Sequence, residues 1–307
     1  MALDSYTIAV LLPAKNEAAS IGQVVADFRE ALPWADIYVF DNGSTDETAR
    51  LAAEAGAIVR YEAMPGKGYV LRRMFADIEA DLYVVADADG TNPAHEVPKL
   101  LQHLLNAHLD MVVGSRLASR GGGQFRPGHV VGNRFITTLV NMFFNRQFQD
   151  VMSGYRVMTR RFVKSAPGWA RGFEVETMLM VHAAEVGAAV GEVSTEYLPR
   201  APGTRSKLNT YRDGLRIAAV VIYLIKQARP FLFFNLIAGL FFLAGMLCGL
   251  PVLHEFYETS FITHVPLAIL ASGLMILAGM AGVSGLILDS VSQARREIKR
   301  TLFINVR

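Results

Sequence analysis

The chain has 307 residues, of which 52% are apolar, and its formal net charge is +2. This length suits one large domain with an accessory region, and so balanced a charge argues against a nucleic-acid-binding protein. The single cysteine, Cys248, lies in an apolar run, so no disulfide framework is expected and a reducing compartment is favoured. No Lys or Arg precedes Lys15, and Asp4 precedes the first apolar run, which argues against a cleaved signal peptide.

Short apolar runs alternate with helical patterns along the N-terminal two thirds of the chain. The runs expected to be strands are residues 6–12, 37–40, 58–61, 82–86, 111–113 and, at a sheet edge, 193–198. Helical patterns lie between most of them, and Ser44 with Glu47 fits a capping box at the start of one. Alternation with short links is typical of a mostly parallel, doubly wound α/β sheet.

The fourth run ends at two carboxylates, Asp87 and Asp89, with only Ala88 between them. Five successive apolar residues before them predict a strand buried on both faces, and open α/β sheets bind ligands where such strands end. Two carboxylates this close repel each other unless a cation lies between them. We therefore expect Mg²⁺ or Mn²⁺ on these aspartates and on phosphate oxygens; the alternative is a solvated acidic turn.

Two other strand ends carry polar motifs. Asp41 follows the second run and could accept hydrogen bonds from a ribose or a base. Gly66 and Gly68 let the backbone approach a ligand closely, and Lys67 between them supplies a positive charge. The alternatives are a capped turn at Asp41 and an ordinary loop around Lys67.

The middle of the chain is rich in cations. Residues 117–128 form a glycine-rich basic loop that could close over a charged ligand. Residues 133–148 predict an amphipathic helix with basic edges, Arg134 and Arg146, which suits either a membrane interface or packing on the core. Asp150 could be catalytic or could pair with an arginine.

A second basic loop, residues 199–207, contains three cations and two prolines. It could clamp an anion beside a membrane, or it could be a solvated linker. Residues 208–229, which follow it, contain a short apolar stretch that suits an interfacial or a buried helix rather than a spanning one.

Two uncharged apolar runs, Pro230–Leu253 and Val265–Leu288, have 24 residues each, enough for roughly 30 Å of hydrocarbon at about 1.5 Å per residue. The loop between them contains no Lys or Arg, whereas cations flank both outer ends, including the basic tail of residues 289–307. The positive-inside rule then places the outer ends, and the N-terminal domain, in the cytoplasm. We expect an integral protein of the cytoplasmic membrane.

Taken in order, the motifs resemble those of family 2 glycosyltransferases, and most closely the polyprenyl-phosphate glycosyltransferases of the dolichol-phosphate mannose synthase type. The motifs are residues 13–17, 41–46, 66–68, 87–89, 114–116, 150–156 and 200–207. The resemblance covers about residues 6–226. It implies a GT-A fold over residues 1–207, a GDP- or UDP-linked sugar donor, a polyprenyl phosphate acceptor in the bilayer, and inverting transfer of one sugar, mannose or glucose. It is also compatible with a homo-oligomer.

The resemblance also implies roles for particular residues. The nucleotide sugar would contact Pro13, Ala14, Asn16, Glu17, Asp41, Gly66, Lys67, Asp87, Ala88 and Asp89, and the metal would bind Asp87 and Asp89. The lipid phosphate would contact Arg116, Arg134, Arg200, Ser206 and Lys207. Catalytic roles fall to Asp89, Arg116 and Asp150, the last either as a base or by positioning an arginine.

Two positions depart from the mannose synthase pattern. Asn42 stands where those enzymes usually have a second aspartate, which makes the nucleoside contacts less certain. Thr91 stands where they commonly have glutamine, which leaves the metal one protein ligand short and weakens the case for mannose.

Three other functions compete with this interpretation. A processive polysaccharide synthase would need more membrane spans and a Gln-x-x-Arg-Trp motif, which the sequence lacks. A non-catalytic membrane scaffold or regulator on the same fold would bind the donor without turnover. A nucleotidyltransferase would have no reason to be bound to a membrane.

Overall fold

The computed structural model describes residues 3–116, 127–144, 147–166, 172, 174–199, 219, 222–223, 225–227 and 229–306. The chain divides into two compact units. The first comprises residues 1–221 together with 299–307, and the second comprises residues 222–298.

The first unit is built on one seven-stranded sheet with the order β3-β2-β1-β4-β6-β5-β7. The strands are β1 (Ile8–Ala14), β2 (Asp36–Asp41), β3 (Ile58–Tyr61), β4 (Leu82–Val85), β5 (Met111–Ser115), β6 (Arg156–Thr159) and β7 (Val190–Ser194). All neighbouring pairs are parallel except those that β6 makes with β4 and β5. The predicted mostly parallel α/β sheet is therefore confirmed.

The strand predictions differ most from the structure at β6 and β7, and β1 covers Ile8–Ala14 where residues 6–12 were predicted. Strand β6 was not predicted, because it has only four residues and begins with Arg156, a charged residue that is 1% exposed. The edge strand β7 ends at Ser194 and does not extend to Leu198 as predicted, because residues 195–199 leave the sheet as a loop.

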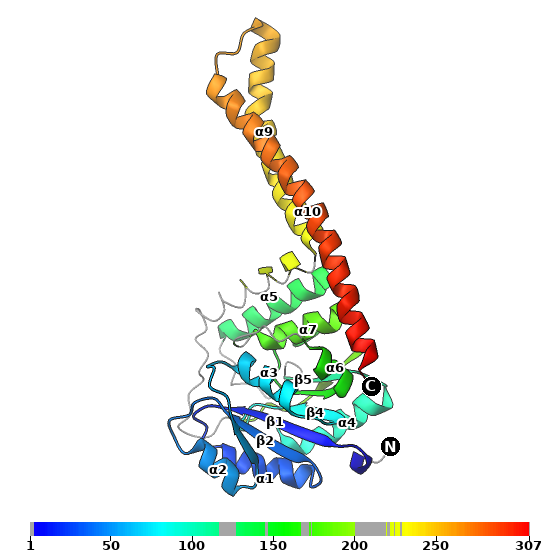
Figure 1. Ribbon diagram of the computed structural model, residues 1–307. Helices are drawn as coiled ribbons and strands as arrows, with labels where there is room; N and C mark the ends of the chain where they lie inside the picture. The colour runs from blue at the N-terminus through cyan, green and yellow to red at the C-terminus, as the bar shows by residue number, and fades with distance from the viewer. Residues whose placement is uncertain are drawn as a thin grey trace. The chain divides into compact units, whose positions relative to one another are not determined.

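Helices cover both faces of this sheet (Figure 1). They are α1 (Ile21–Ala31), α2 (Thr48–Glu54), α3 (Lys67–Asp77), α4 (Val97–Asn106), α5 (Pro127–Phe144), α6 (Arg160–Ser165) and α7 (Val175–Val186), with short 3₁₀ turns at Leu3–Ser5 and Ala94–Glu96. Apolar side chains of α1 and α4 pack against alternate residues of β1 and β4, such as Val10 and Val84, to form the main core. Burial of these side chains is the dominant stabilising term.

The predicted capping box at Ser44 is wrong. Helix α2 begins at Thr48, four residues later, and its N-cap, Glu47, makes no side-chain capping bond. Ser44 instead donates its hydroxyl to Asp41, so it belongs to the turn after β2 and cannot serve the helix.

Helix α5 spans Pro127–Phe144, where residues 133–148 were predicted, and it packs on the core along one stripe. Ile136 and Val140 are buried, and the helix contacts α7, so one stripe packs on the core. Phe135 and Met142, on other faces, have exposed fractions of 58% and 65%. Large exposed apolar side chains of this kind suit a second environment that is also apolar.

The second unit contains α9 (Pro230–Thr259) and most of α10 (Val265–Asn305), whose most apolar windows have mean hydropathies of 2.3 and 2.0. By length and composition both helices could cross a membrane. Helix α10 does not stop at Leu288 but continues through the basic segment to Asn305. Within this unit, the side chains of Ser292 and Arg295 donate to the carbonyl oxygen of Gln227 over 2.8 and 2.7 Å.

The last residues of α10 belong to the first unit and bind its helices. Lys299 Nζ lies 2.5 Å from Glu185 Oε2 at the end of α7. The guanidinium of Arg161 lies over the ring of Phe303, 5.0 Å from its centre, and Phe303 is 6% exposed. The C-terminus is therefore part of the packed domain.

We expect Phe303→Ala to lower the free energy of unfolding of the first unit by about 3 kcal/mol, because it removes a buried ring and leaves a cavity. Thermal unfolding of the detergent-solubilised protein measures the change. The matched control is Ile304→Ala at a neighbouring side chain that is 73% exposed. Equal shifts in the two variants would contradict the packing described here.

Candidate functional site

The carboxyl ends of β2, β1 and β4 meet at one edge of the sheet. These strands are parallel neighbours, with Ala14 opposite Asp41 and Leu11 opposite Val85. The Ser20 hydroxyl donates to the carbonyl oxygen of Ala88 over 2.9 Å and so joins the loop after β1 to the loop after β4. The motifs predicted to act together are therefore neighbours in space.

The loops after β1 and β2 are bound to each other. Asn16, with φ of 51°, accepts a 2.7 Å hydrogen bond from the Thr45 backbone, and its own backbone N–H donates to Ser44 Oγ over 2.9 Å. Asp41 accepts hydrogen bonds from both the backbone and the hydroxyl of Ser44. Glu17 is buried beside them, and its backbone donates to Thr48 Oγ1 over 2.8 Å. Of the other residues expected at the nucleotide, Pro13 and Ala14 end β1.

Asn42 has a structural role that explains the missing second aspartate. Its amide nitrogen donates to the carbonyl oxygens of Glu62 and Met64 over 2.9 and 2.7 Å. Its amide oxygen accepts from the backbone of Gly66 over 2.7 Å. An ionised aspartate has no hydrogen to donate, so only an amide can bind both partners here. Gly66, at φ 134°, adopts a conformation that other residues rarely tolerate, and α3 begins directly after it.

Asp87 and Asp89 follow β4 as predicted. Asp89 is 5% exposed and accepts hydrogen bonds from the backbone and hydroxyl of Thr91 over 3.1 and 2.7 Å. The Asp87 side chain is 32% exposed, and its backbone donates to Asn92 Oδ1 over 2.8 Å. Thr91 therefore orients a carboxylate. The two carboxylates supply the oxygen donors that Mg²⁺ or Mn²⁺ prefers.

Lys67 lies between two carboxylates. Its Nζ is 2.6 Å from Asp87 Oδ1 and 2.6 Å from Glu176 Oε1, and its side chain is only 11% exposed. Burial alone would lower the pKa of Lys67, but the charges of Asp87 and Glu176 raise that pKa above its ordinary value. Lys67 is therefore a permanent cation next to the proposed metal ligands.

Asp150 is fully buried in an ion pair. Arg116 Nε lies 3.1 Å from Asp150 Oδ2, and Asn133 donates to Asp150 Oδ1 over 2.8 Å. Burial would raise the pKa of Asp150, but Arg116 and these hydrogen bonds hold that pKa below its ordinary value. A carboxylate in this state positions an arginine better than it accepts a proton.

Three residues of the site were missed or given no role from the sequence. Glu176 was predicted only as part of the start of a helix. Its position as a second acid inside an apolar helix could have indicated a role at the site. Arg156 donates to the carbonyl oxygens of Val151, Ser153 and Glu176, which binds the loop after Asp150 to α7. Gly154 touches the charged cluster directly: a Cβ on it would lie 2.9 Å from Asp87 Oδ2 and 3.0 Å from Lys67 Nζ.

The residues predicted to bind a lipid phosphate are only partly described. Arg116 lies at the site, and its guanidinium faces the ring of Tyr197, 5.8 Å from the ring centre. Arg134 is exposed on α5, next to Phe135. Arg200, Ser206 and Lys207 lie outside the described residues.

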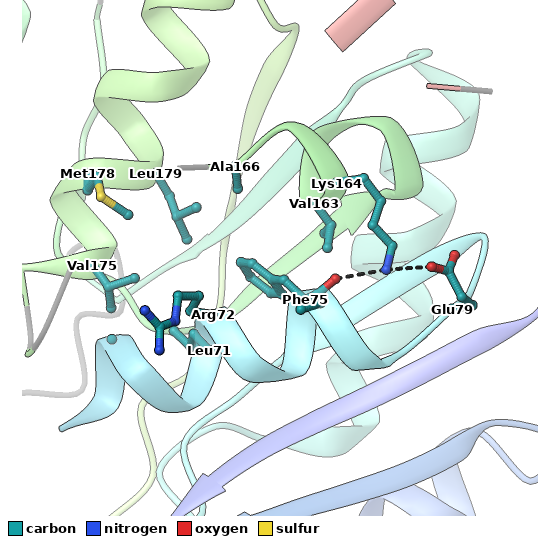
Figure 2. A pocket seen from close by; sticks show the side chains of 12 residues that line it. Leu71, Arg72, Phe75, Glu79, Val163, Lys164, Ala166, Val175, Met178 and Leu179 are labelled. Atoms are coloured by element: carbon teal, nitrogen blue, oxygen red, sulfur yellow. Dashed lines mark hydrogen bonds and ion pairs between the residues drawn. The ribbon is translucent and has the colours of Figure 1, made fainter. Parts of the chain in front are cut away.

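A pocket of about 320 Å³ lies between α3, α6 and α7 (Figure 2). Its walls are mostly apolar, with Phe75, Val175 and Leu179 among them. Lys164 borders it and donates to the carbonyl oxygens of Phe75 and Ile78, both over 2.8 Å, which caps the end of α3. None of the carboxylates at the sheet edge lines this pocket.

The sequence of this chain is similar to those of known proteins. Residues 9–165 match the family described as Glycosyl transferase family 2. Glycosyltransferase AglJ of Haloferax volcanii is 31% identical over 291 residues, which are 94% of this chain and 95% of that protein. Dolichyl-phosphate hexose transferase of the same organism is 26% identical over 222 residues, 72% of this chain and 95% of that protein.

One solved structure is similar in fold. Glucosyl-3-phosphoglycerate synthase from Mycobacterium tuberculosis, in complex with Mn²⁺, UDP-glucose and phosphoglyceric acid, aligns with a TM-score of 0.59. The alignment covers 72% of this chain and 80% of that one, at 23% identity.

We expect Asn42→Asp to lower the free energy of unfolding by about 1–3 kcal/mol, because two carbonyl oxygens lose their donor. Chemical denaturation of the solubilised protein measures this. Asn106→Asp, at an exposed residue that ends α4, is the control. The assignment is wrong if both substitutions leave the protein equally stable.

The lowered pKa of Asp150 makes a prediction about pH. The stability that its ion pair contributes is fully present above the ordinary carboxyl pKa of about 4 and is lost as the pH falls below it. Between about pH 5.5 and 8, Asp150 is therefore ionised and positions Arg116. Asp150→Asn should misplace Arg116 and lower kcat by about a hundredfold throughout this range. The shape of the plot of kcat against pH should not change.

The control for this variant is Asp110→Asn, which removes another buried aspartate from its ion pair with Arg161, away from the site motifs. It should affect stability more than kcat. Loss of the acidic limb of the pH profile in Asp150→Asn alone would instead identify Asp150 as a general base.

Proposed function

The chain belongs to glycosyl transferase family 2, and from that premise we propose that it transfers one sugar from a nucleotide-diphosphate sugar to a polyprenyl monophosphate, with inversion at the anomeric carbon. One observation carries the proposal. The same chain combines carboxylates and cations at the edge of a parallel sheet with two helices, Pro230–Thr259 and Val265–Asn305, that could cross a membrane. A soluble acceptor would not require the second feature.

The donor would bind at the ends of β1, β2 and β4. Asp87 and Asp89 would hold Mg²⁺ or Mn²⁺, which when bound supplies Lewis-acid neutralisation of the departing diphosphate. The similar fold of an enzyme crystallised with Mn²⁺ and UDP-glucose supports this assignment. Asp41 and Glu17 would contact the nucleoside, while the amide of Asn42 already binds partners within its loop.

The acceptor needs positioning more than it needs a base. The second pKa of a phosphomonoester is about 6, so the attacking oxygen is largely anionic at neutral pH. Cations must instead bring this anion near another anionic group. Arg116, fixed by Asp150, would hold the lipid phosphate together with Arg134, Arg200, Ser206 and Lys207. The similarity to a dolichyl-phosphate hexose transferase supports this acceptor class.

The hydrocarbon of the acceptor explains the apolar helices. Removing a prenyl chain from a bilayer costs roughly 0.8 kcal/mol per CH₂ group, so the enzyme has to work at the membrane. We assign the sheet domain to the cytoplasmic face, because cations flank the outer ends of the apolar pair and none lies between its spans. Exposed Phe135 and Met142 on α5, with Arg134 beside them, suit contact with lipid.

Membranes that contain the protein should transfer label from one member of a panel of UDP- and GDP-sugars into the organic phase, and only when a polyprenyl phosphate is present. Membranes without the protein are the control. Transfer to a water-soluble product, or none from any donor, would contradict the proposed acceptor.

Lys207→Ala should raise the KM for polyprenyl phosphate about tenfold and leave the KM for the donor unchanged, because one charge-assisted contact to phosphate is lost. Lys99→Ala, on an exposed lysine of α4, is the matched control. Equal increases in both KM values would remove Lys207 from the acceptor site.

A further inference from the structure

Lys67 is shared between a carboxylate that faces the proposed metal and one that does not. Asp87 is one of the two proposed metal ligands, and its side chain is one-third exposed. Glu176 comes from the first turn of α7, and its side chain is only 8% exposed. The two carboxylates hold the same ammonium group at the same distance, 2.6 Å.

One carboxylate oxygen of Glu176 can still accept a hydrogen bond. Its second oxygen, Oε2, is buried and has no hydrogen-bond partner among the described residues. A buried acceptor without a donor is costly, so this oxygen is suited to a donor that arrives in another state of the site. The ammonium group of Lys67 is already bound to the other oxygen of this carboxylate and has three hydrogens to donate.

We propose that Glu176 is a positioning residue, which keeps Lys67 in the site when Asp87 exchanges the ammonium group for a divalent cation. The inference rests on the proposed function, because it takes Asp87 as a metal ligand. Without Glu176, Lys67 would have only Asp87 as a partner and would compete with the cation for it. With Glu176, Lys67 can leave Asp87 and remain charged and buried next to the diphosphate.

Two neighbouring residues, Gly154 and Arg156, restrict the charged cluster. Gly154 covers the Lys67–Asp87 pair so closely that a single added methyl group would touch both of their charged ends. Arg156 fixes the backbone of Glu176 by donating to its carbonyl oxygen over 2.9 Å. Glu176, on one side of the Lys67 ammonium group, therefore has a fixed backbone, whereas Asp87, on the other side, is partly exposed.

A double-substitution cycle tests the inference. The probe is Mn²⁺, and its binding to the detergent-solubilised full chain with saturating UDP is followed by electron paramagnetic resonance of the free ion. Glu176→Gln should weaken Mn²⁺ binding about tenfold, within the usual range of coupling between sites. In the Lys67→Met background the same substitution should change Mn²⁺ binding less than about twofold, because the competing ammonium group is gone.

Equal weakening of Mn²⁺ binding in both backgrounds would overturn the inference, since Glu176 would then act through its charge and not through Lys67. No Mn²⁺ binding by the wild-type protein would overturn the metal site, and this inference with it. If the protein consumes labelled donor but no label enters the lipid phase, the proposed acceptor is refuted and this inference is unaffected.

Glu185→Gln is the matched control, because Glu185 is a second buried glutamate of α7 that pairs with a lysine, Lys299, over 2.5 Å. It should not change Mn²⁺ binding. Thermal unfolding verifies that each variant is folded, and if Lys67→Met is not, Lys67→Gln takes its place in the cycle, since an amide can still donate to both carboxylates.

Discussion

A buried ammonium group between two carboxylates connects the separate parts of this site. Lys67 begins α3, Asp87 follows β4 and Glu176 lies in the first turn of α7, so one cation connects three elements that are distant in sequence. Removing the ammonium group would leave the buried carboxylate of Glu176 uncompensated, at a cost of about 3–5 kcal/mol. Folding therefore assembles the charged cluster as a unit, and a ligand that enters must rearrange existing ion pairs.

A second ion pair follows the same principle at Arg116, which we propose to bind the acceptor. Asp150 is completely buried and holds Arg116 by two atoms of its guanidinium group as well as by its backbone. Charges of opposite sign thus alternate along the series Glu176, Lys67 and Asp87. Arg116 and Asp150 form a separate ion pair. This distribution suits a reaction that must bring two anionic groups together, and the proposed chemistry needs no strong base.

The sequence predicted features that depend on neighbouring residues better than it predicted contacts between residues that are distant along the chain. The apolar run before Asp87 and Asp89 predicted both the buried strand and the position of its carboxylates. It could not show that Glu176 shares Lys67 with Asp87, because 109 and 20 positions separate Lys67 from its two partners. Ser44 fitted a helix cap by spacing alone, but Asp41 competes for its hydroxyl. Strand β6 escaped prediction because its first residue is a buried arginine that satisfies itself with carbonyl oxygens.

The carboxylates after β4 are the point on which donor binding, cation binding and the role of Lys67 all depend. The most direct measurement is electron paramagnetic resonance of Mn²⁺ with UDP and the purified protein, comparing wild type with Asp89→Asn and with Asp77→Asn, an aspartate of an exposed ion pair on α3. We expect one bound Mn²⁺ per chain in wild type and Asp77→Asn, and its loss in Asp89→Asn with the fold retained. Unchanged Mn²⁺ binding in Asp89→Asn would contradict the site described here.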